Sequence, residues 1–439
     1  MTKKLIIIAL SVVLAVIGAA IGAYFFFTRP VKIYSQKVNA NTFELNLEGE
    51  NIASLDELLD KLSPFLFLKK LDLGDFKVFD ADADRLSKEL PGVEIKCDRY
   101  IMLYGDYVRI NSLSLDLSNK NITDIGELTT ALKMFNSITD VDLYGNGFSK
   151  EQQEQLIDAF PGVAFGFDVS LLGKTYNSKT EDLDLSGNTK VTPDLMREYV
   201  KFFPNLKRLD MSDCGATNEE MAKLREDLPG IKVVWRVHLG RWSLKTDAVA
   251  FSVLIYTYDY DRMTTEDIQV LKYCTDLQAL DLGHQAITDI SVLGDYLPQL
   301  RILILADNRV SDLSPIAKMK HLHYLELFVN SRQLTDLSPI AACKELVDVN
   351  VSYLHNVRDI SALYDLPLLE RIWFEHTPIP AAQVNTLREK HPDARIVTEG
   401  TGSIDQGWRT HERYHAMIGM FHDKNCKVLS ESFSKYDNK

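Results

Sequence analysis

The last part of the sequence contains residue types at a spacing known from metal-dependent hydrolysis. His411, Glu412 and His415 match the pattern H-E-x-x-H, in which two histidines one helical turn apart bind zinc and the glutamate activates water. Arg413 stands at a position that zinc proteases keep uncharged, and only 24 residues follow His415, with Glu431 as the acid that would have to complete the site. We therefore expect a short terminal helix without catalytic use and no enzyme activity; a small zinc hydrolase is the alternative.

A second group of acids resembles the start of a calcium-binding loop. Asp80, Asp82 and Asp84 alternate as such loops do, but Arg85 stands where glycine is expected and Pro91 where the final glutamate is expected. Acidic side chains also favour the N-terminus of a helix, where they interact with its dipole. These aspartates are therefore expected to begin a helix that Pro91 ends.

The histidines and cysteines do not form a ligand pattern. His321 and His323 flank Leu322 just before a predicted strand, without an acid or cysteine at ligand spacing, and we interpret them as surface residues. The five cysteines are widely scattered without a C-x-x-C pair, which indicates neither a zinc site nor a disulfide framework. We expect no cofactor and no metal. The cysteines are Cys97, Cys214, Cys274, Cys343 and Cys426.

A short apolar-polar-apolar strand pattern recurs through the first half of the chain. Its six copies begin 26, 44, 26, 42 and 26 residues apart, so pairs recur with a period near 70. A fixed period of this kind indicates stacked repeats that share one continuous core. The copies begin at Leu45, Leu71, Leu115, Val141, Leu183 and Leu209.

The second half repeats the pattern with a shorter period. Leu254 precedes Leu280 by 26 residues, and strands follow at spacings of 23, 22, 24 and 23. The residues around these strands fit the leucine-rich template L-x-x-L-x-L-x-x-N/C-x-L, with a complete match from Leu300 to Val310. These strands are centred on Leu303, Leu325, Val349 and Ile372.

Additional coils and the helices between strands can also be located. Pro91, Pro161, Pro229 and Pro392 each lie 20 residues after a strand start, and each is expected to end a helix and release the chain into another parallel strand. Residues 311–317 and 335–341 predict short, tight turns. Helix starts are predicted by capping pairs: Ser54 with Glu57, Ser149 with Gln152, Thr217 with Glu220, and Thr192 before Pro193. The predicted fold class is an α/β solenoid, a leucine-rich repeat with a curved parallel sheet and convex helices and turns.

The residue between the two apolar positions of each strand points away from the core. In the first half these positions form an acidic ladder, which is either a site for cations or a basic partner, or an ordinary solvated choice in such strands. Neighbouring unit charges about 5 Å apart repel by about 1 kcal/mol in water. The ladder comprises Asp72, Glu94, Asp116, Asp142, Asp184 and Asp210.

In the second half the outward positions are apolar, aromatic or basic instead. Clustered aromatic and arginine side chains are typical of binding hot spots, so we expect a partner-binding patch here. The alternative is a C-terminal cap that covers the patch with Trp408, Tyr414 and Phe421. The patch comprises Ile302, Ile304, Tyr324, Glu326, Phe328, Arg371, Trp373 and Glu375.

The N-terminal residues predict on which side of the membrane the repeats are located. Residues 5–27 are uncharged and long enough as a helix to cross a bilayer, and Lys3 and Lys4 precede them, which keeps the short N-terminus in the cytoplasm. We expect an uncleaved signal anchor; a cleaved signal peptide near Gly22 and Ala23 is the alternative. The expected organisation is cytoplasmic residues 1–4, a transmembrane segment 5–27, a linker 28–43, a solenoid 44–400 and a cap or tail 401–439. A net charge of −13 argues against nucleic-acid binding.

Several segments resemble a known family. Residues 287–290, 310–317, 334–341 and 357–360 are similar to the short repeats of internalin-type surface proteins, and residues 407–414 resemble the ending of anchored leucine-rich proteins of Gram-positive bacteria. The resemblance covers residues 277–380 well, whereas the earlier double units are only leucine-rich in general. It implies a bacterial membrane-anchored protein for adhesion or protein binding. We expect a cell-surface scaffold that binds an extracellular protein or glycan through its concave face, with a passive spacer as a further alternative.

Overall fold

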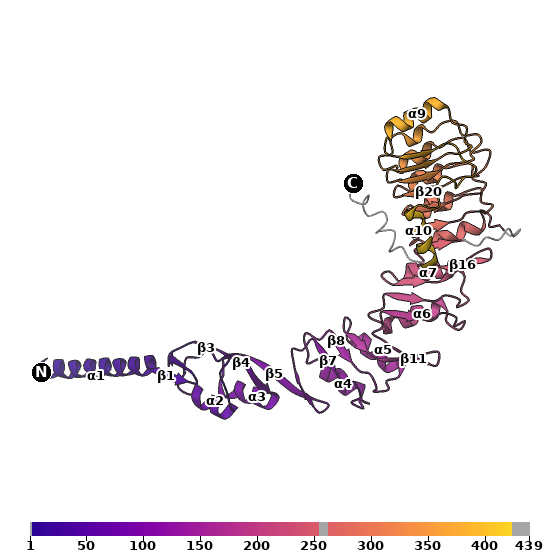
Figure 1. Ribbon diagram of the computed structural model, residues 1–439. Helices are drawn as coiled ribbons and strands as arrows, with labels where there is room; N and C mark the ends of the chain where they lie inside the picture. The colour runs from indigo at the N-terminus through magenta and orange to yellow at the C-terminus, as the bar shows by residue number, and fades with distance from the viewer. Residues whose placement is uncertain (1, 254–261, 424–439) are drawn as a thin grey trace. The chain divides into compact units, whose positions relative to one another are not determined.

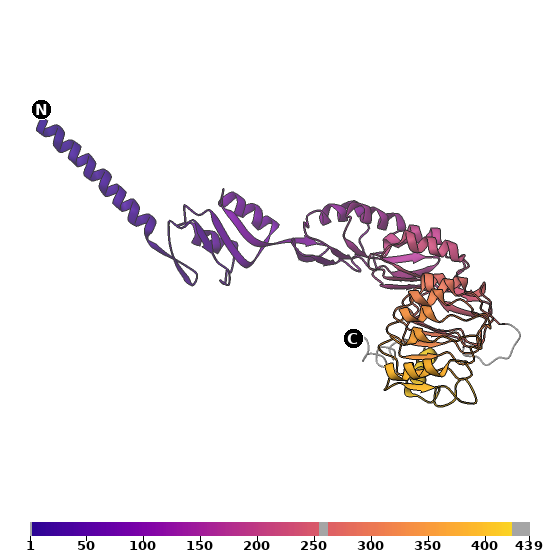
Figure 2. The ribbon, with the colours of Figure 1, turned by 90° about the horizontal axis from the view of Figure 1, so that it is seen from above.

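The computed structural model describes residues 2–253 and 262–423 of the chain. It divides into two compact units, Met1–Thr180 with Lys201–Asn205, and Glu181–Val200 with Leu206–Lys439. Each unit is built from parallel strands that lie side by side, with the helices of each coil to one side of them (Figures 1 and 2). The 3₁₀ helix η1 (Val200–Phe202) contains residues of both units.

The first unit starts with a long apolar helix, continues with a small hairpin and then forms repeat coils. In helix α1 (Thr2–Thr28), the stretch Ile8–Phe26 has a mean hydropathy of 2.4 and no buried residue, so its length and composition suit either a signal sequence or a membrane anchor. The remaining elements are β1 (Pro30–Ile33), β2 (Gln36–Asn39), β3 (Glu44–Asn46), α2 (Leu55–Leu62), β4 (Lys70–Phe79), α3 (Asp80–Glu89), β5 (Glu94–Leu103), β6 (Asp106–Arg109), β7 (Ser114–Asp116), α4 (Ile125–Leu132), β8 (Asp140–Asp142), α5 (Lys150–Ala159), β9 (Ala164–Gly166), β10 (Asp168–Leu171) and β11 (Lys174–Asn177).

The second unit contains a three-stranded and a seven-stranded parallel sheet, with a hairpin between them in the sequence. Its elements are β12 (Asp182–Asp184), α6 (Pro193–Tyr199), β13 (Arg208–Asp210), α7 (Asn218–Asp227), β14 (Lys232–Val234), β15 (Arg236–Leu239), β16 (Trp242–Lys245), β17 (Ala250–Ser252), η2 (Asp267–Tyr273), β18 (Ala279–Asp281), α8 (Ser291–Tyr296), β19 (Ile302–Ile304), η3 (Ser314–Lys318), β20 (Tyr324–Glu326), η4 (Ser338–Ala342), β21 (Asp348–Asn350), η5 (Ser361–Leu363), β22 (Arg371–Trp373), α9 (Ala381–Lys390), β23 (Arg395–Val397) and α10 (Glu412–Asp423).

The strand register confirms the predicted leucine-rich repeat fold. Leu45 pairs with Leu71 and Leu71 with Ile95 in the first unit, where the third coil follows the proline as expected. In the seven-stranded sheet the corresponding chain of partners runs from Phe251 through Leu280 to Ile396. Leu45, Leu71 and Leu280 are almost completely buried, and each such side chain contributes about 1.5–3 kcal/mol by leaving water.

One predicted strand is displaced in the sequence. The strand that pairs with β18 is centred on Phe251, which is 29 residues before Leu280, rather than on Leu254. Leu254 itself lies outside the described residues. Phe251 takes the inward position of β17 that was expected for Leu254. The strand therefore lies three residues earlier in the sequence than predicted.

The local signals for helices and hairpins are confirmed. Ser149 and Thr217 form complete capping boxes, and the hydroxyl groups of Ser54 and Thr192 accept hydrogen bonds from the first turns of α2 and α6. The segments predicted as tight turns form the 3₁₀ helices η3 and η4. After the third coil of each group, the chain forms an antiparallel hairpin; these hairpins are β5–β6, β10–β11 and β15–β16.

The Asn/Cys position of the template carries hydrogen bonds between coils. The Asn308 side-chain amide donates to the carbonyl oxygens of Leu282 and Leu305, and its Oδ1 accepts from the Ile287 amide. Cys214 donates from Sγ to the Leu185 carbonyl oxygen at the equivalent position. Such side chains satisfy main-chain groups that the turn of each coil would otherwise leave buried and unpaired. The cysteines within the described residues are all free thiols.

Candidate partner-binding site

The patch predicted on the last strands is present on one face of the seven-stranded sheet, but it is not exposed. Because side chains alternate along a strand, Tyr324 and Glu326 point away from the face that buries Leu325. All eight patch residues are nevertheless at most 6% exposed. The predicted exposure is wrong because the C-terminal segment 401–423 lies over this face. The covered residues are Ile302, Ile304, Tyr324, Glu326, Phe328, Arg371, Trp373 and Glu375.

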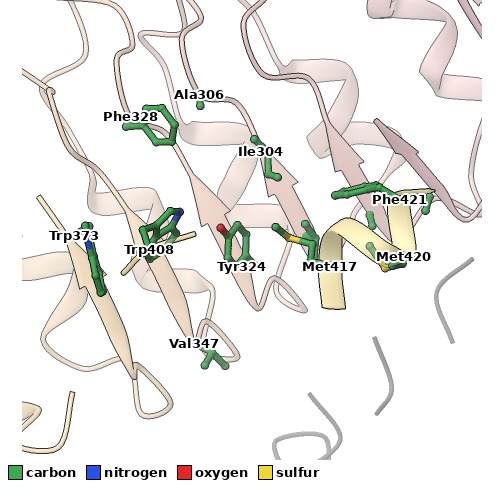
Figure 3. Packing of buried hydrophobic residues seen from close by; sticks show 13 residues of the cluster. Ile304, Ala306, Tyr324, Phe328, Val347, Trp373, Trp408, Met417, Met420 and Phe421 are labelled. Atoms are coloured by element: carbon green, nitrogen blue, oxygen red, sulfur yellow. The ribbon is translucent and has the colours of Figure 1, made fainter. Parts of the chain in front are cut away.

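Trp408 is the centre of this cover. Its ring centroid lies 5.4 Å from that of Tyr324 and 5.1 Å from that of Trp373, so the indole sits between two aromatic rings of the sheet (Figure 3). The Arg371 guanidinium lies 4.5 Å from the Trp408 ring centroid, which adds a cation–π contact. The Trp408 indole Nε1 donates to Glu326 Oε1 at 2.7 Å. Trp408 is fully buried, and its tilted ring contacts and its hydrogen bond together fix its position.

Helix α10 continues the cover toward the start of the sheet. Met417, Met420 and Phe421 on one side of the helix belong to the same buried cluster as Ile302 and Ile304 (Figure 3). The strands opposite the helix contribute small side chains, which allow it to approach closely. These are Ala250 and Ala279.

A buried ion pair network fixes the beginning of α10. Arg413 donates from Nη2 and Nε to the two carboxylate oxygens of Asp348 at 2.7 and 3.1 Å, and from Nη1 to Glu370 at 2.6 Å. Arg371 donates from Nη1 to Asp348 at 3.1 Å and from Nη2 to the Trp408 carbonyl oxygen at 2.6 Å. Burial lowers the pKa of Arg371, while for Arg413 the opposing burial is outweighed by Asp348 and Glu370, which raise its pKa. Asp348 therefore binds both arginines.

Two glutamates of the covered face are buried as well. Burial raises the pKa of Glu326, against the opposing effect of the hydrogen bonds from Tyr324 and Trp408. Glu375 is fully buried against Gly400, and neither of its carboxylate oxygens has a hydrogen-bond partner among the described residues. Burial, followed by the charge of Asp405, raises the pKa of Glu375. An ionised carboxylate in such a place costs free energy, which weakens the seating of the segment.

Two of the four ladder acids of the first unit, Asp72 and Asp142, are paired with lysines. The Lys96 ammonium donates to Asp72 at 2.7 Å, and the Lys179 ammonium donates to Asp142 at 2.6 Å. Asp116 accepts from the Ser118 amide and thereby stabilises the turn after its strand. The pKa of Asp72 is lowered mainly by Lys96. Glu94 starts β5 and is exposed, but it pairs with Lys70, whereas Asp72 pairs with Lys96, so the assignment of Glu94 to the ladder is wrong by two residues.

The two ladder acids of the second unit differ in burial. Asp184 is exposed and accepts from the Ser186 amide. Asp210 is fully buried and accepts from Lys245 at 2.6 Å and Arg208 at 2.8 Å. Burial opposes ionisation of Asp210, but these hydrogen bonds outweigh it and lower its pKa to about 2. The lysines come from different places: Lys96 is the register partner of Asp72 on the neighbouring strand β5, Lys179 follows hairpin β10–β11, and Lys245 ends strand β16 of hairpin β15–β16. The paired acids thus connect neighbouring parts of the stack.

The residues considered for metal binding have other positions. His411 precedes α10, and Arg413 between the two histidines forms the ion pair with Asp348. His321 is exposed, as expected, whereas His323 is buried, so its interpretation as a surface residue is wrong. Both lie near Glu345, at 3.0 and 3.7 Å. Within residues 2–253 and 262–423 there is no group of three histidine, cysteine, aspartate or glutamate side chains that would hold a metal ion. Glu431 lies outside the described residues.

The aspartates that resemble a calcium loop have the expected structural place. Asp80 starts helix α3, and Asp80 and Asp82 lie in its first turn. The helix ends at Glu89, just before Pro91. This arrangement agrees with the interpretation that these acids stabilise a helix N-terminus.

A column of left-handed residues at one edge of the second unit was not predicted. Each residue of the column follows the last apolar residue of a strand pattern by two positions. The main-chain amides of these residues continue the hydrogen bonding between coils. The Asp307 amide, for example, donates to the Phe328 carbonyl oxygen at 2.9 Å. Val329 and Tyr353 have φ angles of 58° and 55°, which are unusual for such side chains. Their surroundings are open enough to leave Val329 40% exposed. The column comprises Asp213, His284, Asp307, Val329, Tyr353 and His376.

Comparisons with known proteins agree with the repeat architecture. A family profile described as "Leucine Rich repeats (2 copies)" matches residues 298–342. Among solved structures, an internalin (InlF) of Listeria monocytogenes is 17% identical over 84% of this chain and 86% of that chain, with a TM-score of 0.27. Internalin C2 of the same organism is 22% identical over 53% and 87%, with a TM-score of 0.30. A leucine-rich repeat protein of Leptospira interrogans is 15% identical over 81% and 96%, with a TM-score of 0.28. The family profile and the strand register together identify leucine-rich repeats in this chain.

Proposed function

We propose that this chain is a bacterial cell-surface scaffold that binds an extracellular protein or glycan through the concave face of its second unit. The observation that carries the proposal is that this face already holds a polypeptide segment. An indole contacts the Trp373 ring at a tilted angle, a guanidinium pairs with Asp348, and an apolar helix side packs on Ile304. A face that holds a segment by these three kinds of contact has the chemistry of a protein-binding surface, since aromatic and arginine residues dominate such sites.

Location on the outside of the cell is part of the proposal. The apolar stretch of α1 and the two lysines before it support a single-pass anchor with the bulk of the chain extracellular. We accordingly propose a cytoplasmic segment 1–4, a membrane segment 5–27, a linker 28–43, a repeat region 44–400 and a cap or tail 401–439. The acidic ladder is proposed as a secondary electrostatic feature only, because lysines pair with several of its members.

The location can be tested on intact cells. External protease is expected to digest a tag placed after residue 439 while a cytoplasmic marker stays intact. Protection of the tag in intact cells, with digestion only after lysis, would contradict the proposed location. A full-length chain that stays with the membrane fraction at high salt would distinguish an anchor from a cleaved signal peptide.

Binding can be tested with the full-length chain in detergent, incubated with cell-surface proteins and glycans of candidate target cells. The wild type is compared with Tyr324→Phe, which removes only the hydroxyl bonded to Glu326, and with Trp373→Ala. The exposed Phe43→Ala in the first unit is the control. We expect Trp373→Ala to lose a partner that Phe43→Ala retains. A passive spacer predicts the same bound set for all variants that melt cooperatively.

A further inference from the structure

The covered face is a receptor for a segment with a definite chemical pattern. Its aromatic pocket, formed by Tyr324 and Trp373, holds an indole, and Asp348 holds a guanidinium five residues later in the segment. Apolar side chains of β17, β18 and β19 then hold one side of a helix. Polar contacts to the segment's main chain fix its direction: Asn350 Nδ2 donates to the Ser403 carbonyl oxygen at 2.7 Å, and Trp373 Nε1 donates to that of Asp405 at 3.0 Å.

The segment that fills this face is joined to the repeats through one short connection. Strand β23 ends at Val397, and the first contact of the cover with the face is made by Gly400, which packs against Glu375. Exposed Glu399 lies between these two points. A change in the direction of the chain at residues 398–400 is therefore enough to carry segment 401–423 away from its own face without disturbing the strands.

Seating the segment has a built-in cost. The Glu375 carboxylate is buried where Gly400 leads into the segment, and its two oxygens have no hydrogen-bond partner in the described parts of the chain. Glu326 is buried with it, although that carboxylate receives hydrogen bonds from Trp408 and Tyr324. Burial of these carboxylates lowers the free energy gained by seating and thereby eases release of the segment, which is the step that must precede exchange.

We propose that the concave face of the second unit binds segment 401–423 of a second copy of this chain, in exchange for its own. The partner is defined by the face itself, because the tryptophan, the arginine and the Met-Phe helix side that it fits are supplied by this sequence. Every contact made within one chain is remade between two chains, so the exchange needs no new interface. This inference rests on the proposed function in one respect: anchoring in one membrane would raise the effective concentration of copies.

Charge reversal on the two sides of the buried ion pair tests the proposal. In full-length chains, Arg413→Asp places an acid opposite Asp348, and Asp348→Arg places a base opposite Arg413 and Arg371. Each variant alone should release its own segment and stay monomeric. Mixed together they should form a one-to-one dimer, because each face then meets a segment of opposite charge. A chain that carries both substitutions again has opposite charges at the two positions. This double variant should therefore be monomeric when it is measured alone.

The measurements are mass by light scattering in detergent and recovery of one tagged variant with the other. We expect the mixed pair to associate more than about tenfold more tightly than either variant with itself, since reversing a buried charge pair weakens binding by at least that factor. Cooperative melting of both single variants without formation of the mixed dimer would overturn the proposal. This outcome would leave the proposed location and the binding of an external partner untouched, because those are measured on the wild type.

The wild-type chain provides a second test if either charge variant does not fold. A labelled synthetic peptide of residues 401–423 should be captured by the full-length wild type after prolonged incubation, and the same peptide with Trp408→Ala should bind more than about tenfold more weakly. Absence of capture at peptide concentrations far above that of the protein, with the chain's own α10 remaining protected from hydrogen exchange, would show that the face is permanently closed and would refute the exchange.

Discussion

The Trp408 indole donates its Nε1 proton to Glu326 Oε1 over 2.7 Å, although the two residues are 82 positions apart in the sequence. This hydrogen bond joins the C-terminal segment to β20, the middle strand of the seven-stranded sheet, and covers the face on which aromatic side chains gather. In most leucine-rich repeat strands these outward positions are polar, whereas here a segment of the same chain covers them. This hydrogen bond is therefore a feature of this particular sequence and not of the repeat pattern.

Replacing Trp408 by alanine should destabilise the second unit strongly. The change removes a fully buried side chain between Tyr324 and Trp373 and leaves a cavity, which typically costs about 3–5 kcal/mol. Urea denaturation followed by circular dichroism measures the loss. Trp242→Ala in the hairpin β15–β16, where the side chain is only partly buried, is the matched control and should cost much less. Equal losses in the two variants would contradict a central role for Trp408.

The ion pair of Arg413 with Asp348 should be worth far more than an exposed pair. Arg413→Gln leaves the fully buried Asp348 with one fewer cation, and breaking a buried pair costs about 3–5 kcal/mol. Lys207→Gln breaks the pair with Glu181, in which both side chains are more than half exposed, and should cost less than about 1 kcal/mol. A double-mutant cycle with Asp348→Asn gives the coupling energy. A coupling as small as that of the exposed pair would show that the network does not hold α10.

Seating of the C-terminal segment should weaken as pH rises. Burial and Asp405 raise the pKa of Glu375 from its ordinary 4.5, with His376 opposing, so the protonated form is favoured in the seated state. The contribution is complete below pH 4.5 and is lost as pH rises through the raised pKa. Glu326 and Asp281 act in the same direction, whereas the lowered pKa of His411 acts in the opposite one.

Glu375→Gln isolates this effect because glutamine has the same shape and does not titrate. Urea midpoints measured by tryptophan fluorescence at about pH 5 and about pH 8 should differ less in the variant than in the wild type. The variant should also be the more stable of the two at the higher pH. An unchanged difference between the two pH values would exclude Glu375 as a source of the pH dependence.

Val329→Gly should stabilise the chain slightly or leave its stability unchanged. The valine has a φ of 58°, in the left-handed region, where a side chain costs about 1–2 kcal/mol. Glycine removes that cost but loses about 0.5–1 kcal/mol through the greater freedom of the unfolded chain. Val329→Ala is the control, since alanine keeps the strain. Thermal melting should place the glycine variant above the alanine variant, and the reverse order would show that packing of Val329 outweighs its strain.

Most of the repeat architecture could be predicted because its signals are local. A strand such as Leu71–Leu73 is recognised from alternation over a few residues, and the helix after Ser149 from a capping pair three residues apart. The same signals recur in every coil, so agreement between copies compensates for weak evidence in any one of them. The prediction was wrong at Leu254, where the chain departs from the regular period and the pairing partner of Leu280 is Phe251 instead.

The candidate site could be predicted only in its composition. The sequence shows that Tyr324, Trp373 and Arg371 share one face of a sheet, since strand alternation places them there. It does not show whether water, a partner or the chain itself covers that face. The pairing of Lys245 with the buried Asp210 was hidden for the same reason, because the lysine lies in a hairpin outside the repeat pattern.

The sequence by itself determined the repeats, their inward and outward positions, the helix starts and the apolar N-terminal helix, because each depends on residues close together in the chain. Only the tertiary structure decided that segment 401–423 lies on the seven-stranded sheet and that Arg413 pairs with Asp348. Those contacts join residues separated by many coils and follow no period. Their strength comes from shape and charge that exist only once the strands are stacked.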